Sequence, residues 1–234
     1  MHDCALATTT SLGWRSFAAP VSRGGLVAFR ISEYANGQQD LTGDVDTNDT
    51  LVCVVPSTGG APIVLRLEGW FFDMSAHLLI GSRTEAGPLG GDLNGDGDRN
   101  DQVGFLYDDR TGALRSLGRT LMGFAWDPDA PTRFLGAVEA DVAAYAISEL
   151  GEGRDLNGDG DLADAVPEVV DQLGNVLGAA RVAIEHRASN AIQLSPGWLG
   201  FVASEQMQGQ DLDGTARPAP TCRSSSTSRS RSAR

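Results

Sequence analysis

The chain has 234 residues, of which 41% are hydrophobic and 21% charged, and its formal net charge at pH 7 is −13. This composition is typical of a globular protein, and no apolar run approaches the roughly 20 residues that a membrane crossing needs. The negative charge argues against a nucleic-acid partner, because a polyanion would be repelled. We therefore expect neither membrane insertion nor nucleic-acid binding, and small cations are the partners that the charge favours.

The cysteines and the N-terminus carry little functional information. Cys4, Cys53 and Cys222 lack C-x-x-C spacing, so neither a zinc site nor a disulfide framework is indicated, and a bridge between Cys4 and Cys53 stays open. The N-terminal residues lack the basic and apolar regions of a secretory signal. We expect either that the protein is not exported or that this sequence begins inside a longer gene.

One composite pattern occurs four times along the chain: an apolar strand, a glutamate, an Asp-rich loop and a second apolar strand, the fourth copy being incomplete. The glutamates recur at intervals of roughly 50 to 65 residues, which suits a multi-stranded β-unit rather than a short solenoid coil. In chain order, the first strands are predicted at residues 26–32, 77–84, 142–148 and 198–204, and the strands after the loops at residues 50–55, 102–107 and 165–170.

Within each complete unit, a turn and a further β-like stretch follow the strand after the loop. The turns, at residues 56–60, 108–112 and 171–175, are rich in residues that favour tight chain reversal. A fourth apolar stretch precedes a unit at residues 71–75 and again at 191–197. Four short strands per unit, repeated, are typical of the blades of a β-propeller. Little helix is expected, since no segment longer than two turns keeps helical apolar spacing without Gly or Pro.

Two segments carry motifs of a known repeat: residues 194–204 read Leu-Ser-Pro-Gly-Trp-Leu-Gly-Phe-Val-Ala-Ser, and residues 105–112 read Phe-Leu-Tyr-Asp-Asp-Arg-Thr-Gly. They resemble the first and the second half, respectively, of the TolB-type, WD40-like β-propeller repeat. The resemblance covers roughly residues 20 to 214 and implies an all-β fold of four-stranded blades. The Asp-rich loop is not part of the usual repeat.

We therefore predict one all-β domain over residues 1–214, an incomplete β-propeller with about three complete four-stranded blades and a partial fourth. The predicted units span residues 14–68, 69–120, 121–184 and 185–214. Such a stack would have exposed edges, and a second copy of the chain or a larger parent protein could complete the ring. Residues 215–234 are rich in Ser and Arg and contain no acid, which predicts a disordered tail. Whether a frameshift produced this tail stays open.

The Asp-rich loops carry the pattern of a calcium-binding loop. Loop two (residues 92–101) and loop three (residues 155–164) place oxygen donors at positions 1, 3, 5, 7 and 10, with Gly at position 6 for the sharp turn. Calcium takes six to eight oxygen ligands at about 2.3–2.6 Å, whereas magnesium keeps more of its water. The predicted ligands are Asp92, Asn94, Asp96, Asp98 and Asp101 in loop two, and Asp155, Asn157, Asp159, Asp161 and Asp164 in loop three.

The first half of each loop resembles the loops of EF-hands, dockerins and thrombospondin type 3 repeats, D-x-[DN]-x-[DN]-G. Val103 and Val166 stand where an EF-hand has a bidentate Glu, so the acids at position 10 are the expected substitutes. Since strands rather than helices flank the loops, we predict a structural site and not a sensor. A solvated turn is the alternative, but the mutual repulsion of so many carboxylates disfavours it unless a cation is bound.

Loop one (residues 40–49) is a degenerate copy that should bind more weakly, because Val45 replaces the glycine. Its predicted ligands are Asp40, Thr42, Asp44, Asp46 and Asp49. A glutamate precedes each of the four loops closely enough to reach back as an extra ligand; these are Glu33, Glu85, Glu149 and Glu205. Loop four keeps only Asp211 and Asp213 before the pattern ends, so we expect it not to bind.

The predicted function is that of a calcium-binding β-repeat protein, a binding or scaffold module whose loops Ca²⁺ stabilises. An extracellular or periplasmic location is favoured, because such loops without a position-12 Glu need plentiful calcium. A calcium-dependent propeller hydrolase with a central-channel active site is the alternative. However, no catalytic motif is present, and His2, His77 and His186 share no motif context. A surface that binds a protein or glycan ligand is a third possibility.

Overall fold

The computed structural model describes residues 2–3, 8–9, 11–16, 19–86, 90–122, 135–185 and 191–215. Strands make up 46% and helices 6% of the structure, so the predictions of an all-β fold and of little helix are confirmed. Among the described residues, no helix has the length and apolar character that crossing a bilayer requires. Cys4, His186 and residues 216–234, which include nearly all of the predicted tail, lie outside the described residues.

The largest sheet contains seven antiparallel strands in sequence order. They are β3 (Val21–Arg23), β4 (Leu26–Ser32), β5 (Thr50–Val55), β6 (Ile63–Met74), β7 (Leu78–Thr84), β8 (Gln102–Asp108) and β9 (Ala113–Thr120). The long strand β6 changes partner midway: Glu68 pairs with Leu51 of β5, and the next residue, Gly69, pairs with Arg83 of β7. A side chain has no room at Gly69, where a Cβ would lie 2.2 Å from a backbone oxygen of β7.

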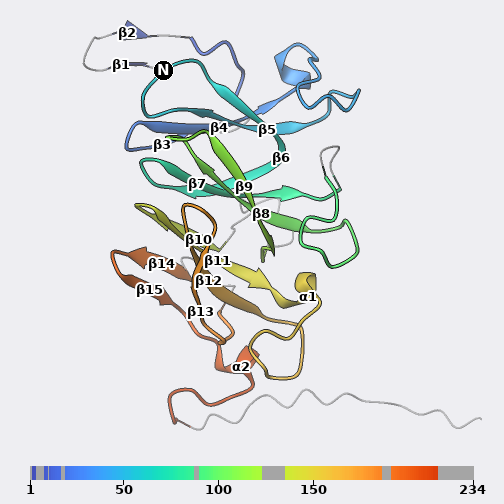
Figure 1. Ribbon diagram of the computed structural model, residues 1–234, viewed down its shortest axis with the longest axis vertical. Helices are drawn as coiled ribbons and strands as arrows, with labels where there is room; N and C mark the ends of the chain where they lie inside the picture. Colours follow the sequence, from blue (N-terminus) through green and yellow to red (C-terminus); the bar gives the residue numbers. More distant parts are fainter. Residues whose placement is uncertain are drawn as a thin grey trace, which may run out of the picture.

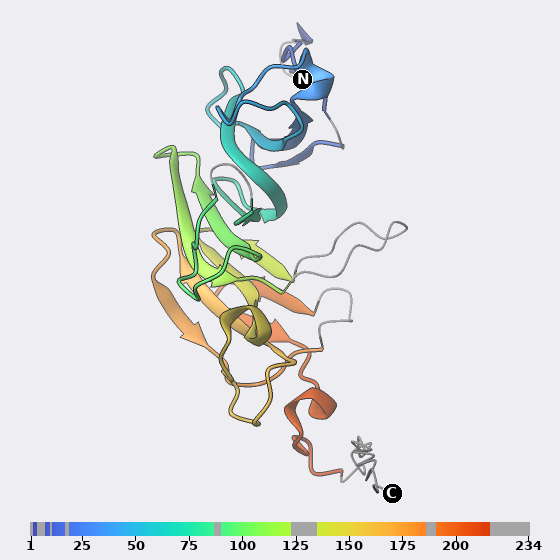
Figure 2. The same ribbon diagram turned by 90° about the vertical axis from the view of Figure 1, so that its right-hand side faces the viewer.

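Because of this change of partner, β3–β6 and β6–β9 form two four-stranded meanders that share one strand. Figure 2 shows β6, in teal, curving from the first meander into the second. A third meander and a C-terminal hairpin follow, and none of the sheets closes on itself. The strands of the third meander are β10 (Gly136–Glu139), β11 (Val142–Ser148), β12 (Ala165–Asp171) and β13 (Val176–Ala179).

The remaining elements are short. The C-terminal hairpin consists of β14 (Ile192–Ser195) and β15 (Trp198–Phe201), and an N-terminal pair consists of β1 (His2–Asp3) and β2 (Thr8–Thr9). The helical turns are η1 (Tyr34–Asn36), α1 (Glu149–Glu152) and α2 (Glu205–Gln208). α1 and α2 begin at the glutamates of the third and fourth repeated patterns, and η1 begins one residue after the glutamate of the first.

The meanders stack one upon the next along the long axis of the molecule (Figure 1). In β8, Phe105 packs in a cluster with Leu26 of the first meander, whereas its neighbour Leu106 packs with Tyr145 of the third. A further cluster joins the third meander to the C-terminal hairpin. The central strands therefore bury both faces, which is why they read as continuous apolar runs rather than as alternating ones. Each fully buried aliphatic side chain contributes about 1.5–3 kcal/mol.

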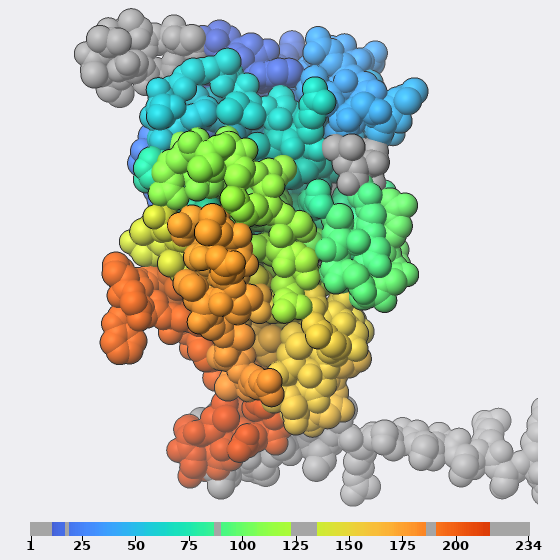
Figure 3. Space-filling view, in the orientation of Figure 1, coloured from blue at the N-terminus to red at the C-terminus, as the bar shows by residue number. Residues whose placement is uncertain are grey.

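Loops one, two and three leave the stack on one side. Each joins the second and third strands of its meander: loop one joins β4 to β5, loop two joins β7 to β8, and loop three joins β11 to β12. Figure 3 shows them protruding along the same edge of the molecule, in blue, green and yellow. The tight turns between the third and fourth strands lie at the opposite end of the strands. We call these two sides the loop end and the turn end.

Candidate metal centre

Loop two folds around its own side-chain oxygens. Asp92 accepts the N–H groups of Gly95 and Gly97, one on each carboxylate oxygen, at 2.6 and 3.1 Å. The side chains at positions 3, 5 and 7 each accept the N–H of the second residue after them, at 3.1, 2.9 and 2.8 Å. Asp and Asn favour such turns locally, and the two glycines supply the positive φ angles of 83° and 99° that the backbone needs. The sequence of the loop thus specifies its fold.

Loop three repeats this arrangement. Asp155 accepts the N–H groups of Gly158 and Gly160 at 2.5 and 2.9 Å, and positions 3, 5 and 7 repeat the following turns at 3.0, 3.1 and 2.8 Å. The amide of Asn157 donates to Asp164 Oδ2 at 2.7 Å, as the amide at the same position of loop two donates to the acid at its position 10 at 2.9 Å. The side chains at positions 3 and 10 are therefore joined in both loops.

A buried glutamate holds the start of each loop. Glu33, Glu85 and Glu149 are 0% exposed, and Oε1 of each accepts the backbone N–H groups of the second and third loop residues. In loop three these bonds are 2.6 and 2.9 Å long. The second oxygen of Glu33 and of Glu149 is buried and has no hydrogen-bond partner. A buried charged oxygen that lacks partners costs free energy.

Carboxylates of each loop gather beside one another. Three acids of each loop region present oxygens that lie within 4.8 Å of one another; the groups are Glu85, Asp98 and Asp101 for loop two, and Glu149, Asp161 and Asp164 for loop three. The ion pairs of the described residues involve other acids. Within the part of the chain that the structure describes, neither group forms an ion pair with an Arg or His side chain, although Arg83 interacts electrostatically with Glu85 at longer range.

The crowding of charge perturbs the last acid of each loop. Burial, together with the neighbouring carboxylate of Asp96, raises the pKa of Asp101 to about 6. Burial and the neighbouring Asp159 raise the pKa of Asp164 to about 7. In contrast, the N–H of Asp98 donates to Asp96 and lowers the pKa of that carboxyl. Ionisation of the position-10 acids is therefore opposed unless a cation is present.

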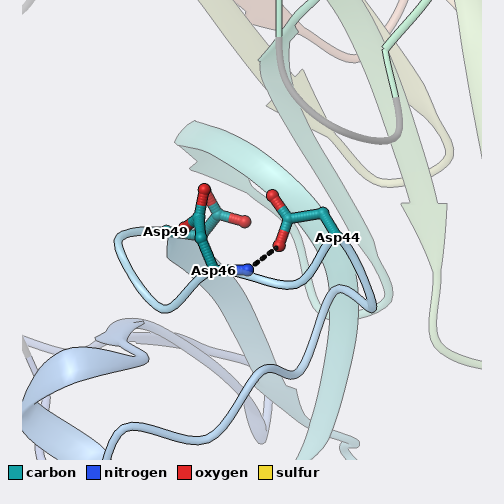
Figure 4. A group of neighbouring side chains, drawn as sticks. All are labelled: Asp44, Asp46 and Asp49. Carbon is teal, nitrogen blue, oxygen red and sulfur yellow. Dashed lines mark hydrogen bonds between the residues drawn. The ribbon is translucent and has the colours of Figure 1, made fainter.

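Loop one keeps the acids but with a different geometry. Its compact group consists of Asp44, Asp46 and Asp49, and Figure 4 shows these side chains together with the bond from the Asp46 N–H to Asp44 Oδ1, 3.1 Å long. Val45 replaces the position-6 glycine and is held at φ 81° with 92% exposure. A β-branched residue in this region is strained, so the loop conforms to the pattern at an energetic cost.

Loop four forms more of the arrangement seen in the other loops than its sequence predicts. Glu205 Oε1 accepts the N–H groups of Leu212 and Asp213 at 2.9 and 3.0 Å, which repeats the arrangement at the other three glutamates. Oxygens of Glu205, Asp211 and Asp213 lie within 4.8 Å of one another. The signal for this group is present in the sequence, because the glutamate precedes the first loop Asp by the same interval as in loop three. Unlike the other glutamates, Glu205 is only half-buried.

The compact groups contain some of the predicted ligands and leave out others. Asp98, Asp101, Asp161, Asp164, Glu85 and Glu149 are brought together, as are three acids of loop one. The other predicted acidic ligands are not members of these groups; they are Asp40, Asp92, Asp96, Asp155, Asp159 and Glu33. Among the predicted ligands that are not acids, Asn94, Asn157 and Thr42 each donate a hydrogen bond to an acid of the group in their own loop. In loop one, the N–H groups of Gly43 and Val45 lower the pKa of Asp40.

A Ser, a His and an Asp meet at the turn end, which sequence reasoning did not detect. Ser57 Oγ donates to Asp109 Oδ2 at 2.7 Å, and His77 Nδ1 lies 2.9 Å from Asp109 Oδ1. Ser57 Oγ also lies 3.2 Å from His77 Nδ1. A hydrolytic triad needs the serine and the acid on opposite ring nitrogens, whereas both face Nδ1 here. The cluster therefore ties the first meander to the second and gives no support to the hydrolase hypothesis.

Comparison of the chain with protein-family models, with curated proteins and with solved structures finds no match. Function therefore has to be inferred from the site itself.

Proposed function

We propose that this chain is a calcium-binding β-repeat protein, in which Ca²⁺ closes loops two and three and, more weakly, loop one. The observation that carries the proposal is the fully buried glutamate beside loops two and three, Glu85 and Glu149, which lies among further carboxylates and forms no ion pair with a described residue. For Glu149, one oxygen also lacks any hydrogen bond. A folded chain would not retain such an arrangement without a compensating cation.

The donor set favours calcium over other ions. All the donors are oxygens, from carboxylates, the Asn amides and the backbone, and they are concentrated in ten consecutive residues plus one glutamate. Hard oxygen donors in this number suit the six to eight ligands of Ca²⁺, whereas Mg²⁺ prefers fewer protein ligands and retains its water. Zinc and other softer metals would use His or Cys, and the described residues of these loops contain neither.

The proposed role of the ion is structural. Each loop connects two paired strands, so an ion bound there fixes the pairing, and its binding free energy adds to the stability of the fold. Strands flank loops one to three, apart from the short helical turns η1 before loop one and α1 before loop three, so the long helices that an EF-hand sensor moves are absent around these loops. We therefore favour a binding or scaffold module over an enzyme.

The meanders support an incomplete, TolB-like propeller as the architecture. Each four-stranded meander resembles a blade, and isolated bridges repeat at equivalent places, pairing Leu121 with Ile147 and Ile184 with Ala203. A second copy of the chain is proposed to complete the ring. Trp198 of the terminal hairpin, which is 79% exposed, is available to that copy or to a protein or glycan ligand. An extracellular or periplasmic location would supply the calcium that such loops need.

Isothermal titration calorimetry of the metal-depleted chain tests the proposal. We expect at least two Ca²⁺ ions to bind per chain, with Mg²⁺ binding more weakly. Asp98→Asn and Asp161→Asn should each remove one tight site, because both acids belong to the compact groups. Asp171→Asn is the matched control, since Asp171 caps a turn outside the loops. Absence of binding to a chain whose β-structure is verified by circular dichroism would refute the proposal.

A further inference from the structure

The short helix α1 contacts two of the proposed calcium sites at once. Its first residue, Glu149, is the buried acid of loop three. Two residues later, the carbonyl of Gly151 accepts a hydrogen bond from Asn94, the position-3 residue of loop two in the preceding meander, at 3.1 Å. Asn94 and Gly151 are far apart in sequence and meet only because the second and third meanders stack. One helical turn therefore connects the two loops.

The contact with loop two is part of a small polar network. Asn94 Nδ2 lies within hydrogen-bond distance of three acceptors: Asp101 Oδ2 at 2.9 Å, Thr120 Oγ1 at 2.7 Å and the Gly151 carbonyl. Thr120 Oγ1 in turn donates to the same carbonyl at 3.2 Å. An amide at position 3 can offer its oxygen to an ion and its nitrogen to this network, which a carboxylate cannot do.

Close packing leaves little freedom in this network. A Cβ on Gly151 would lie 2.3 Å from Thr120 Cγ2 and 3.1 Å from Asp101 Oδ1, so only glycine fits between loop two and β9. Glu152, the last residue of α1, accepts the backbone N–H of Thr120 at 2.8 Å and pairs with Arg119 at 3.1 Å. The helix is therefore fixed to β9 at the same place where it touches loop two.

Between the third meander and the C-terminal segment, the hydrogen bond that fixes the helical turn is repeated, but the polar network is not. Gln208 of α2 accepts the backbone N–H of Ala183 at 2.7 Å, as Glu152 does from Thr120. The residue equivalent to Thr120 is thus Ala183, which has no hydroxyl. In loop three, the amide of Asn157 donates only within its own loop among the described residues. The connection from loop to following helix is therefore specific to loops two and three.

We propose that the sites of loops two and three are coupled through α1, so that an ion in one site raises the affinity of the other. This inference rests on the proposed calcium-binding function. An ion in loop two fixes Asn94 and Asp101, which orders Thr120 and the Gly151 carbonyl and so places Glu149 for loop three. The second ion then binds to a loop that is already ordered, so its binding loses less conformational entropy. Linkage requires the same coupling in the reverse direction.

Calcium titrations of the full chain test the coupling, with loop one silenced by Asp44→Asn in every variant. We expect two ions to bind cooperatively, the second at least about five times more tightly than independent sites would allow, at the low end of typical allosteric couplings. Thr120→Val removes the hydroxyl and should reduce the coupling to near onefold while two ions still bind. Thr120→Ser keeps the hydroxyl and should restore the coupling.

Three outcomes separate the proposals. If two ions bind independently in the parent chain, or if Thr120→Val remains as cooperative as the parent, the coupling is refuted while the calcium function stands. If no ion binds to the parent chain, both proposals fail. If Thr120→Val does not fold, as judged by circular dichroism, Asn94→Asp takes its place, because it retains an oxygen ligand and loses the donor of the network. Persistence of the cooperativity in that variant would likewise refute the coupling.

Discussion

The turn end and the loop end of the same strands treat buried acids in opposite ways. At the turn end, Asp109, whose side chain is 1% exposed, has both His77 and Ser57 as partners. Asp108 is paired with Arg110 at 3.0 Å. At the loop end, Glu149 is 0% exposed and has only two backbone N–H groups on one of its oxygens.

The difference indicates where the protein's own side chains balance its buried charges and where a ligand is required to do so. Both ends tie neighbouring meanders together, through Ser57 and Asp109 at one end and through Asn94 and Gly151 at the other. The turn end brings its own positive charge and hydroxyl groups. At the loop end, the acids of loops two and three form no ion pair with a described residue, so the stability of these loops should depend on a cation while that of the turn end should not.

Removal of calcium should give the largest effect. Two sites that each contribute about 2.7 kcal/mol at an ion concentration of 100 Kd add roughly 5 kcal/mol of stability. For a chain of this size, a chelator should therefore lower the melting temperature by about 10 °C or more. Differential scanning calorimetry with and without chelator, followed by addition of Ca²⁺ or Mg²⁺, measures this. An unchanged melting temperature would show that the loop end is self-sufficient.

Neutralising the buried acid Glu149 should change the stability of the fold in opposite directions with and without calcium. Glu149→Gln keeps the oxygen that accepts two N–H groups and removes the charge. We expect destabilisation of about 2–4 kcal/mol in calcium, because one site is lost, and stabilisation of about 1–3 kcal/mol in chelator, because a buried charge without a partner is removed. Urea unfolding under both conditions gives the two values.

The turn end supplies the control for this change of sign. Asp109→Asn weakens bonds to His77 and Ser57 and should destabilise by about 1–3 kcal/mol whether calcium is present or not. If Glu149→Gln behaves like Asp109→Asn, with the same loss in both conditions, Glu149 is an ordinary buried acid and not a ligand.

The stability of the calcium-depleted chain should depend on pH through the acids at the loop end. The pKa values of Asp101 and Asp164 are raised from 3.8 to about 6 and about 7, so the folded chain holds protons that the unfolded chain has lost. Their contribution to stability is fully present below pH 4 and is lost as the pH rises through about 6 to 7. Urea unfolding between pH 4.5 and 8 in metal-depleted buffer should show this fall. A rise in stability over that window would contradict it.

The smallest expected effect concerns loop one. Val45→Gly replaces an exposed β-branched residue at φ 81° by the residue that loops two and three have at that position, with φ 99° and 100°. Relief of this strain should stabilise the chain by about 1 kcal/mol and raise the calcium affinity of loop one. Thermal unfolding and a calcium titration measure the two effects. Val45→Ala keeps a Cβ and should give less of both.

The local features of this protein are readable from its sequence. Asp, Asn and Gly at fixed positions in ten consecutive residues determine the turns of loops two and three, because each bond spans only two to five residues. The glutamate before each loop acts over a similarly short interval. The all-β class follows from the repeated short apolar strands between turns.

Features that depend on stacking are not readable in this way. The long strand β6 contains residues 71–74, most of the stretch 71–75 that reads as a separate strand in the sequence, and its continuity depends on a change of partner at Gly69. The network of Asn94, Thr120 and Gly151 joins segments that no local pattern connects. The sequence predicts no binding by loop four because its later positions break the pattern, yet its first bonds need only Glu205 and Asp211.

A crystal structure of the chain grown in millimolar calcium tests the central claim most directly. We predict a Ca²⁺ ion in loop two and another in loop three, each with six to eight oxygen ligands at about 2.3–2.6 Å. Asp98 and Asp101 should be among the ligands in loop two, and Asp161 and Asp164 in loop three. Well-ordered loops in which these carboxylates point apart into solvent, with no ion between them, would contradict the account.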